Sequence, residues 1–405
     1  MPVSPVPQDI LRQLAHKTDS KIVLLVCDGL AGLPHPETGL TEMETARTPN
    51  LDALARRSMQ GYAELVGPGI TPGSGPGHLS IFGYDPLRYP VGRGVLSALG
   101  VGFPLEPTDV AARMNFCTLD AQGRIVDRRA GRIPTARSLP LVEKLRQIKL
   151  PYVEVFVEPE MDYRAVLVLR GEGLSGAVSD TDPQVMGQEP LPPRALEPAA
   201  ERTAELASEF VRQAREILRN DYPANGVLLR GFAELPELPH VGDLYQLTAA
   251  AIAVYPMYRG LARLVGMQIL PTGTTMRDEI VTLREHWNQF DFFFIHFKYT
   301  DSAGEDGDFE RKVRVLEEID GLIPELLELQ PDVFAMTGDH STPAILKGHS
   351  WHPSPFLLHS RWVLPDGCAR FTERTARQGS LGRFHMSEAM SLLLAHALKL
   401  LKYGA

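Results

Sequence analysis

Three apolar runs along the chain each reach an acidic residue at or next to their carboxyl end. They are KIVLLVCD at 21–28, DFFFIHFKYTD at 291–301 and DVFAMTGDH at 332–340. Nearly continuous runs of β-branched, aliphatic or aromatic residues are typical of strands that are buried on both faces of a sheet. The pattern therefore predicts three core strands whose carboxyl ends carry carboxylate side chains.

Helical patterns lie around these runs. Residues 48–59, 309–329 and 387–402 place apolar side chains on one face with helical spacing. Pro324 is expected to kink or divide the second of these helices. The alternation of strands and helices predicts an α/β fold, with a mostly parallel sheet that carries helices on both faces.

The middle of the chain has a different pattern. Residues 110–127 and 152–169 each read as a β-hairpin, and a proline-rich stretch then precedes another helix. We therefore expect a smaller α+β domain at 108–245, inserted into the α/β domain. The α/β domain would then be discontinuous and formed by residues 1–107 and 246–405.

Composition and charge narrow the function classes. The 405 residues are 44% hydrophobic and 22% charged, as in ordinary globular proteins. The net charge of -9 and the lack of a Lys/Arg block argue against binding to nucleic acid. Three scattered cysteines favour a reducing compartment. The first twenty residues lack the pattern of a signal peptide, and no apolar run approaches the ~18 residues of a membrane span. We expect a cytoplasmic protein that does not contact a membrane.

The acidic strand ends indicate the candidate chemistry. In open α/β sheets, ligands bind beyond the carboxyl ends of the strands, so Asp28, Asp301 and Asp339 are expected to converge there. A single aspartate at a strand end is common in turns, but three together favour a site. Four of the twelve histidines fall within 340–359, a density that metal ligation explains better than packing. Carboxylate and imidazole ligands suit Mn²⁺, Mg²⁺, Zn²⁺ or Fe²⁺. The alternative is a polar surface loop.

A second feature is the segment at 67–83, GPGITPGSGPGHLSIFG, in which glycines and prolines surround Ser74. Such a turn at a helix N-terminus offers backbone N–H groups to a phosphate and exposes the serine. It does not match the GxxxxGK[ST] pattern of a Walker loop. A flexible surface loop and a nucleotide-binding loop are the alternatives to a nucleophile. A serine hydroxyl activated by a two-metal site would transfer a phosphoryl group, and the substrate would then be an anion.

Cationic side chains that could bind this anion are expected in the inserted domain and beside Asp301. Guanidinium groups form forked hydrogen bonds with phosphate and carboxylate groups. Lys298 lies on a strand that ends at the expected site. For each arginine, an ordinary surface position is the alternative. The candidates for substrate binding are Arg128, Arg129, Arg132, Arg230 and Lys298.

Several motifs occur in the same order as in a known family. They are CDGLAGLP, TARTPNLDALA, PGSGPGHLSIFGYDP leading into YPVGRGVLSALG, AVYPMYRGLARLVGM, FKYTDSAGEDGD, TGDHSTP and GHSWHPSP. The chain thereby resembles the cofactor-independent phosphoglycerate mutases of the archaeal type, within the alkaline phosphatase superfamily. The short pieces are weakly specific, whereas their order and the intact GYDP-to-GRG segment are very specific. The resemblance implies an alkaline-phosphatase-like sheet and an inserted domain that closes over the substrate as a lid.

The resemblance also implies two divalent ions per chain, Mn²⁺ or Mg²⁺, with Zn²⁺ or Co²⁺ as alternatives. Ser74 would take the phosphoryl group from one hydroxyl of glycerate and return it to the other. 2-Phosphoglycerate and 3-phosphoglycerate would thus be interconverted through a phosphoserine. One ion would be bound by Asp28, Ser74, Asp339 and His340, and the other by Asp301, Glu305 and His349.

Two positions depart from the family pattern. Glu305 stands where relatives usually carry a histidine, in a D-x-x-G-H-x-G-D segment, and a carboxylate is a harder ligand. His352 stands where relatives tend to carry Asp or Asn, so it is left out of the ligand set. The alternatives to a mutase are a hydrolase on the same scaffold, acting on a phosphomonoester, phosphonate or sulfate, and a non-catalytic nucleotide-binding module. A homo-oligomer is compatible with the sequence.

Overall fold

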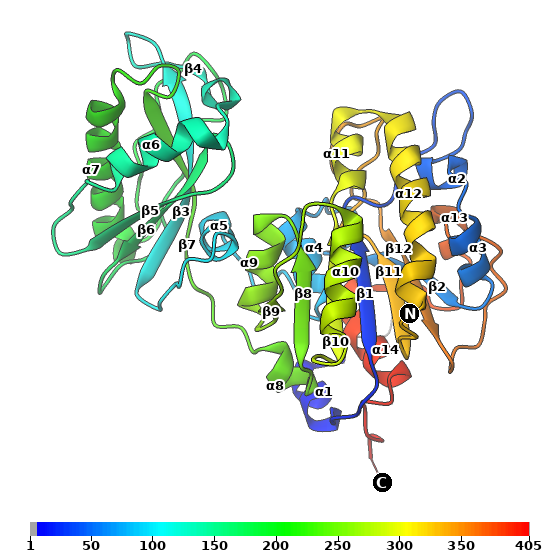
Figure 1. Ribbon diagram of the computed structural model, residues 1–405. Coiled ribbons are helices and arrows are strands. Elements are labelled where there is room, and N and C mark those ends of the chain that lie inside the picture. The colour runs from blue at the N-terminus through cyan, green and yellow to red at the C-terminus, as the bar shows by residue number, and fades with distance from the viewer. Residues whose placement is uncertain (1–5, 405) are drawn as a thin grey trace. The chain divides into compact units, whose positions relative to one another are not determined.

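The computed structural model describes residues 6–404 and divides them into two compact units (Figure 1). Unit 1 consists of the described residues up to Pro90 and from Leu238 onward, and unit 2 is Val91–Glu237. Unit 2 is therefore an insertion in the sequence of unit 1, which is discontinuous.

Unit 1 is built on a mixed sheet. Among the described residues, eight strands pair in the order β13-β2-β12-β11-β1-β10-β8-β9. β12 is antiparallel to both β11 and β2, and the other neighbours are parallel. The predicted core strands are β1, β10 and β11. They lie side by side, and all of their residues are buried. The strands are β1 (Ile22–Cys27), β2 (Met59–Glu64), β8 (Ala249–Ala253), β9 (Gln268–Ile269), β10 (Phe292–Phe297), β11 (Val333–Thr337), β12 (Ser354–Ser360) and β13 (Gly382–His385).

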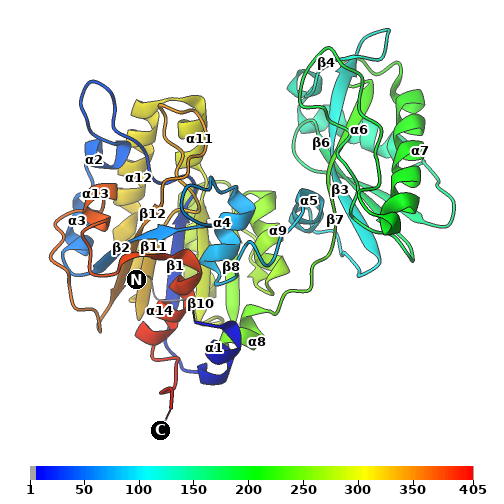
Figure 2. The ribbon, with the colours of Figure 1, turned by 180° about the vertical axis from the view of Figure 1, so that it is seen from behind.

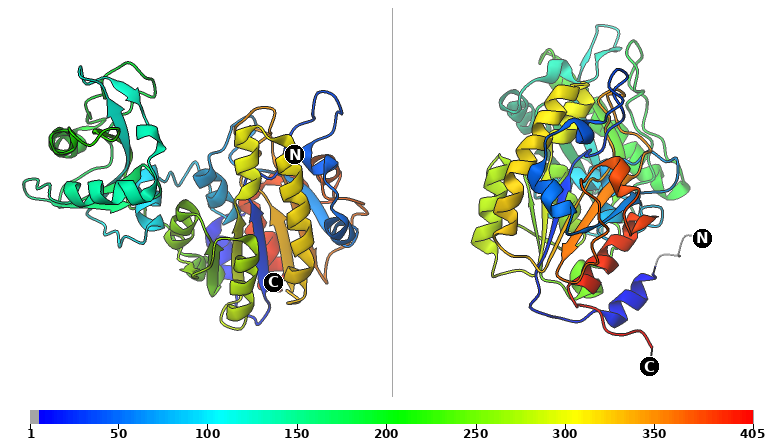
Figure 3. Two further views of the ribbon diagram at one scale, coloured as in Figure 1. Left: turned by 45° about the horizontal axis from the view of Figure 1, so that its top comes forward. Right: turned by 90° about the vertical axis from the view of Figure 1, so that its right-hand side faces the viewer.

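Helices cover both faces of this sheet. α10 and α12 pack on one face, where they share an apolar core with alternate residues of β1 and β10. α4 and α14 lie on the other face (Figures 2 and 3). The predicted α/β architecture with helices on both faces is confirmed. The helices are α1 (Gln8–Leu14), α2 (Glu42–Thr45), α3 (Pro49–Ala55), α4 (Ser74–Ile81), α8 (Val241–Tyr245), α9 (Pro256–Leu264), α10 (Met276–His286), α11 (Tyr299–Asp306), α12 (Phe309–Leu327), α13 (Glu373–Ala376) and α14 (Ala389–His396), with a 3₁₀ turn at Met386–Glu388.

Three predicted helices differ in detail. α3 ends at Ala55 because β2 begins at Met59, and α14 ends at His396. α12 is not divided at Pro324. The Pro324 nitrogen cannot donate to the carbonyl of Asp320, but Asn50 Nδ2 donates to that carbonyl at 3.1 Å. This substitute hydrogen bond lets the helix continue through the proline.

Unit 2 is an α+β unit with an antiparallel sheet. β3 lies between β6 and β7, β5 pairs with the far side of β6, and β4 pairs with the end of β3. α6 and α7 share an apolar core with one face of the sheet. The elements are α5 (Arg93–Gly100), β3 (Asp109–Leu119), β4 (Ile125–Asp127), α6 (Thr135–Leu145), β5 (Glu154–Pro159), β6 (Arg164–Arg170), α7 (Glu201–Leu218) and β7 (Gly226–Glu234), with 3₁₀ turns at Ala130–Arg132 and Pro198–Ala200.

The boundaries between the two units differ from the domain boundaries expected from the sequence pattern. The sequence pattern places them at 107/108 and 245/246, whereas the structure places them after Pro90 and Glu237. The reason is packing: α5 packs on β3 and β7 of unit 2, and α8 packs on α1 of unit 1. Within the described residues, no helix is both long and apolar enough to cross a membrane.

Candidate active site and metal centre

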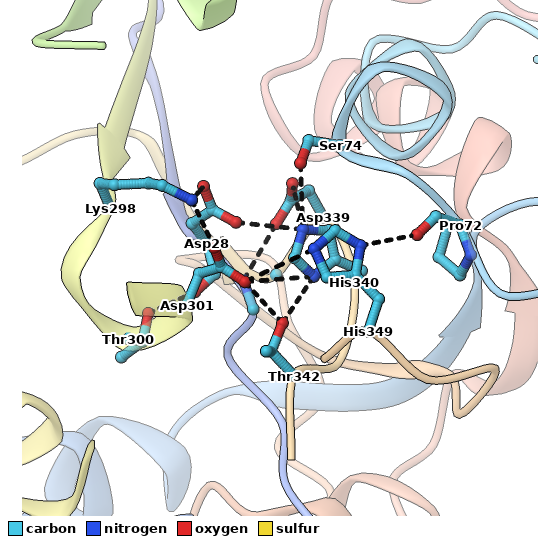
Figure 4. Close-up of polar contacts among 12 residues, drawn as sticks. Asp28, Pro72, Ser74, Lys298, Thr300, Asp301, Asp339, His340, Thr342 and His349 are labelled. Carbon is cyan, nitrogen blue, oxygen red and sulfur yellow. Dashed lines mark hydrogen bonds and ion pairs between the residues drawn. The ribbon is translucent and has the colours of Figure 1, made fainter. Parts of the chain in front are cut away.

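The acidic strand ends converge at one edge of the unit 1 sheet. Asp28 directly follows β1, Asp301 lies in the first turn of α11 after β10, and Asp339 and His340 follow β11. Since these three strands are parallel neighbours, their carboxyl ends meet at the same edge. Ser74, the first residue of α4, faces this group from another part of the chain (Figure 4).

His340 lies at the centre of the group. Its Nε2 atom is 3.1 Å from Asp28 Oδ1, 3.2 Å from Asp339 Oδ2 and 3.2 Å from Ser74 Oγ. Burial by itself lowers the pKa of His340. The negative charges of Asp339, Asp28 and Asp301 outweigh burial and raise this pKa to about 9. The imidazole is thus held among carboxylates, with one nitrogen aimed at the serine hydroxyl.

Lys298 and Tyr258 contact the same carboxylates. Lys298 Nζ is 3.0 Å from Asp28 Oδ2 and also pairs with Asp301 Oδ2. Burial lowers the pKa of Lys298, but the charges of Asp28 and Asp301 outweigh burial. The pKa is therefore raised above its usual value, and the amine stays charged. Tyr258 donates its hydroxyl hydrogen to Asp28 Oδ2. Burial raises the pKa of Asp28, yet Lys298 and two histidines bring it well below its usual range.

A second group of ligand atoms adjoins the first. His349 Nε2 is 3.7 Å from Asp301 Oδ1, and the His349 and His340 rings stack with centroids 3.6 Å apart. His349 Nδ1 donates to the Pro72 carbonyl at 3.0 Å, which leaves Nε2 to face the carboxylate. Glu305 follows Asp301 by one helical turn. Its side chain is more than half exposed, and its Oε1 is 3.9 Å from His349 Nε2.

These residues fit divalent cations. Two sets of ligand atoms each lie within 4.8 Å of one another: Asp28, Asp339 and His340 form one set, and Asp301, His340 and His349 form the other. Asp28 Oδ1 and Asp339 Oδ2 are buried and accept no hydrogen bond within the described chain. Buried carboxylate oxygens that accept no hydrogen bond are costly unless a cation lies beside them, and His340 Nε2 is 3.1 and 3.2 Å from these two. Carboxylate and imidazole donors suit Mn²⁺, Mg²⁺ or Zn²⁺.

The predicted substrate residues fall into two places. Lys298 is part of the metal centre in unit 1, as described above. In unit 2, Arg128 forms a two-pronged ion pair with Asp182, with Nε and Nη2 at 2.9 and 2.7 Å from its oxygens. Arg230 is 3.5 Å from the same carboxylate. Arg129 and Arg132 are exposed to solvent.

Sequence reasoning missed three further arginines of unit 2. Arg113 on β3 lies directly opposite Arg230 on β7, and Arg164 on β6 lies opposite Asn115 of β3. Burial lowers the pKa of Arg93, and the charges of Arg230 and Arg164 lower it further. Both of the opposed arginines have carboxylates nearby: Arg113 Nε lies 3.6 Å from Glu160 Oε2, and Arg230 pairs with Asp180 and Asp182. Arg113 lies inside a mostly apolar strand, whereas Arg164 begins β6 and Arg93 begins α5.

Sequence reasoning also missed residues that support the metal centre. Tyr258 stacks on His296 with ring centroids 3.7 Å apart, beneath Asp28. His78, one turn after Ser74 on α4, lies with its Nδ1 2.8 Å from the Ser74 carbonyl and 3.3 Å from Asp339 Oδ2. These contacts form only when α4, α9 and β10 pack together. A local sequence motif therefore does not predict them.

Comparison with known proteins identifies the family. The sequence model of the 2,3-bisphosphoglycerate-independent phosphoglycerate mutases matches residues 55–225. A probable mutase of this kind from Thermus thermophilus is 53% identical over 401 residues, covering 98% of this chain and 99% of the relative. The chain belongs to this mutase family. A probable mutase from Aquifex aeolicus is 50% identical, covering 98% of this chain and 100% of the relative.

Solved structures agree with this family membership. A protein from Pyrococcus horikoshii has a TM-score of 0.83 at 29% identity, covering 96% of this chain and all of that chain. The cofactor-independent phosphoglycerate mutase of Thermoplasma acidophilum has a TM-score of 0.71 at 29% identity, covering 93% and 100%. The family and enzyme class expected from the motifs are confirmed. Mutase family membership also implies a metal-dependent enzyme, in keeping with the two ligand sets.

Proposed function

We propose that the protein interconverts 2-phosphoglycerate and 3-phosphoglycerate through a phosphoserine on Ser74. The observation that carries this proposal is the position of the Ser74 hydroxyl, 3.2 Å from His340 Nε2 at the edge of a buried carboxylate group. Ser74 also begins α4, where backbone N–H groups and the helix dipole favour an incoming phosphate.

Divalent ions bound at the site would lower the pKa of the serine hydroxyl and stabilise charge on the phosphoryl oxygens. We favour Mn²⁺ or Mg²⁺. Lys298, which pairs with two carboxylates of the site, would contact a phosphoryl oxygen. The proposed ligands are Asp28, Ser74, Asp339 and His340 for one ion, and Asp301, Glu305 and His349 for the other.

The phosphoryl transfer consumes no water. Ser74 Oγ loses its proton and forms a bond to phosphorus while the bond between phosphorus and the glycerate oxygen breaks, and that oxygen gains a proton. The other hydroxyl of glycerate then loses its proton and bonds to phosphorus, while the bond between phosphorus and Ser74 Oγ breaks and Oγ regains a proton. Ser74 is restored, and the phosphoryl group has moved by one carbon. Water must be excluded between the two transfers, because it would otherwise release inorganic phosphate.

We also propose that unit 2 binds the substrate and acts as the lid. Support comes from the arginines gathered on its sheet, where Arg113 faces Arg230 across two strands. Guanidinium groups suit the carboxylate and phosphate groups of phosphoglycerate. The positions of Arg128 and Arg230 at Asp182 favour them over Arg129 and Arg132 as substrate ligands.

One assay separates the mutase from the hydrolase alternative. Purified protein loaded with Mn²⁺ is incubated with 3-phosphoglycerate, and 2-phosphoglycerate and inorganic phosphate are measured together. We expect 2-phosphoglycerate with almost no phosphate. Phosphate released in proportion to the substrate consumed would instead identify a hydrolase. With substrate labelled at phosphorus, rapid quenching should place the label on Ser74, and Ser74→Ala should remain unlabelled.

A further inference from the structure

Thr342 lies between the two ligand sets. Its Oγ1 atom is 2.9 Å from His340 Nδ1 and 2.7 Å from Asp301 Oδ1. A hydroxyl has one hydrogen, and an ionised carboxylate can only accept, so Thr342 donates to Asp301 and accepts from His340 Nδ1–H. This pair of hydrogen bonds orients the imidazole with Nε2 toward Ser74 and ties it to Asp301, which is proposed as a ligand of the second ion (Figure 4).

The position of Thr342 leaves little freedom. A Cβ atom added at Gly29 would lie 2.4 Å from Thr342 Oγ1, and one added at Gly304 would lie 2.2 Å from the Thr342 carbonyl oxygen. Both distances are too short for real contacts. Glycine at these two positions therefore allows the loop after β1 and helix α11 to enclose Thr342 closely.

Lys312 holds the same threonine from the opposite side. This residue of α12 is completely buried, and its Nζ atom donates to the carbonyls of Thr342, Gly29 and Ala31 at 2.8, 2.8 and 2.9 Å. An ammonium group has three N–H bonds, and all three are used. Lys312 thus joins the loop that follows Asp28 to the loop that follows His340.

We propose that Thr342 is a positioning residue that couples the two metal positions, and that Lys312 fixes Thr342 and the Gly29–Ala31 loop. The inference rests on the metal centre of the proposed function. Groups that hydrogen-bond to metal ligands orient them, and their loss typically weakens metal binding by about 10-fold to 100-fold. Because Thr342 touches a ligand of each set, its hydroxyl affects both positions.

The first test compares Thr342→Val with Thr342→Ser. Valine keeps the shape of threonine without the hydroxyl, and serine keeps the hydroxyl. Calorimetric titration of metal-free protein with Mn²⁺ should show affinity about 10-fold to 100-fold weaker for Thr342→Val. Thr342→Ser should stay within about threefold of wild type. If both variants bind Mn²⁺ as wild type does, or both lose affinity equally, the hydroxyl does not couple the positions.

The second test compares Lys312→Met with Lys399→Met. Lys399 is also completely buried, and its Nζ atom donates to the Thr18 carbonyl at 2.8 Å and to Asp291 at 3.2 Å. Asp291 precedes β10, so this second lysine lies at the end of the strand away from the site. Both variants should lower the thermal stability of the metal-free protein. Only Lys312→Met should also weaken Mn²⁺ binding, and equal affinities would overturn its role.

A third variant separates failure of this inference from failure of the metal centre. Asp339→Asn removes a proposed ligand itself. If wild type binds no Mn²⁺, or if Asp339→Asn binds it as wild type does, the metal centre is wrong and the inference falls with it. If Asp339→Asn loses Mn²⁺ while Thr342→Val retains full affinity, the metal centre stands and the coupling through Thr342 is wrong.

Discussion

Ser74 is small and half-buried at the start of α4, and its hydroxyl contacts His340 instead of the core. Removal of this hydroxyl should therefore cost little stability. We expect Ser74→Ala to lower kcat by at least about a thousandfold, as loss of a covalent nucleophile does. Its melting temperature should remain near that of wild type.

Thr71→Ala is the matched control, because Thr71 is exposed in the same glycine-rich loop. It should retain wild-type turnover. Residual activity of Ser74→Ala within about tenfold of wild type would exclude Ser74 as the nucleophile.

Glu305 is the residue at which this chain departs from the family pattern. It lies one helical turn after Asp301, and a carboxylate favours hard ions over borderline ions. We expect Glu305→His to remain active, with its preference moved from Mg²⁺ toward Co²⁺ or Zn²⁺ by about tenfold. The measurement is kcat/KM after loading with each ion in turn.

Asp306→His provides the control, since Asp306 is the next residue and its carboxylate pairs with Arg311 on the surface. This variant should keep the wild-type ion preference. Equal ion preferences for all three proteins would mean that Glu305 is not a ligand.

At the scale of elements, the buried carboxyl of Glu373 joins α13 to the loop after β1 and to the start of α2. Its oxygens accept hydrogen bonds from Gly32 N at 2.8 Å and Thr41 Oγ1 at 2.7 Å. Burial raises the pKa of Glu373 from 4.5 to about 7, with a further contribution from Glu42.

This shift makes stability depend on pH. Between pH 4.5 and 7 the unfolded chain loses the Glu373 proton while the folded chain keeps it, so stability falls as pH rises. Glu373→Gln has no proton to lose. We expect the free energy of unfolding of Glu373→Gln, relative to that of wild type, to rise by up to about 3 kcal/mol as the pH rises across this range. Denaturant titrations at several pH values measure the difference, and a difference independent of pH would contradict the assignment.

The elements around the site could be predicted where one local pattern decides them. β1, β10 and β11 follow from apolar runs, and their shared parallel edge brings Asp28, Asp301 and Asp339 together. The ends of the helices at 48–59 and 387–402 could not be predicted, because they depend on the elements that follow. The hydrogen bond that replaces the missing helix bond at Pro324 is donated to the Asp320 carbonyl by Asn50, which is far away in the sequence.

The supporting residues were beyond sequence reasoning for the same physical reason. Thr342 reads as an ordinary loop residue until two loops meet around it, and Lys312 reads as a surface lysine of an amphipathic helix. Arg113 and Arg230 become neighbours only through the register of β3 and β7. Side chains that act through long-range pairing leave no spacing pattern in the sequence.

At the scale of the whole molecule, the proposed chemistry is divided between the units. The serine and the metal ligands belong to unit 1, and the arginine group belongs to unit 2. A phosphoserine enzyme remains a mutase only while glycerate stays bound and water stays out. Substrate retention by unit 2 would therefore determine whether the phosphoserine in unit 1 returns its phosphoryl group to glycerate or loses it to water.

Arg230→Met tests this division. Loss of an arginine that holds the glycerate carboxylate should let glycerate leave the phosphoenzyme before the second transfer. Water would then attack the phosphoserine in its place. We expect kcat/KM for 2-phosphoglycerate formation to fall by about a hundredfold, and the ratio of inorganic phosphate to 2-phosphoglycerate to rise several-fold.

The control for that variant is Arg212→Met, whose arginine is exposed on α7 and pairs with Glu209 and Glu216. It should match wild type in both rate and product ratio, because its charge serves only the helix surface. A general weakening of unit 2 would lower the rate without changing the product ratio. The ratio is therefore the decisive measurement, and an unchanged ratio in Arg230→Met would mean that this arginine does not retain glycerate between the two transfers.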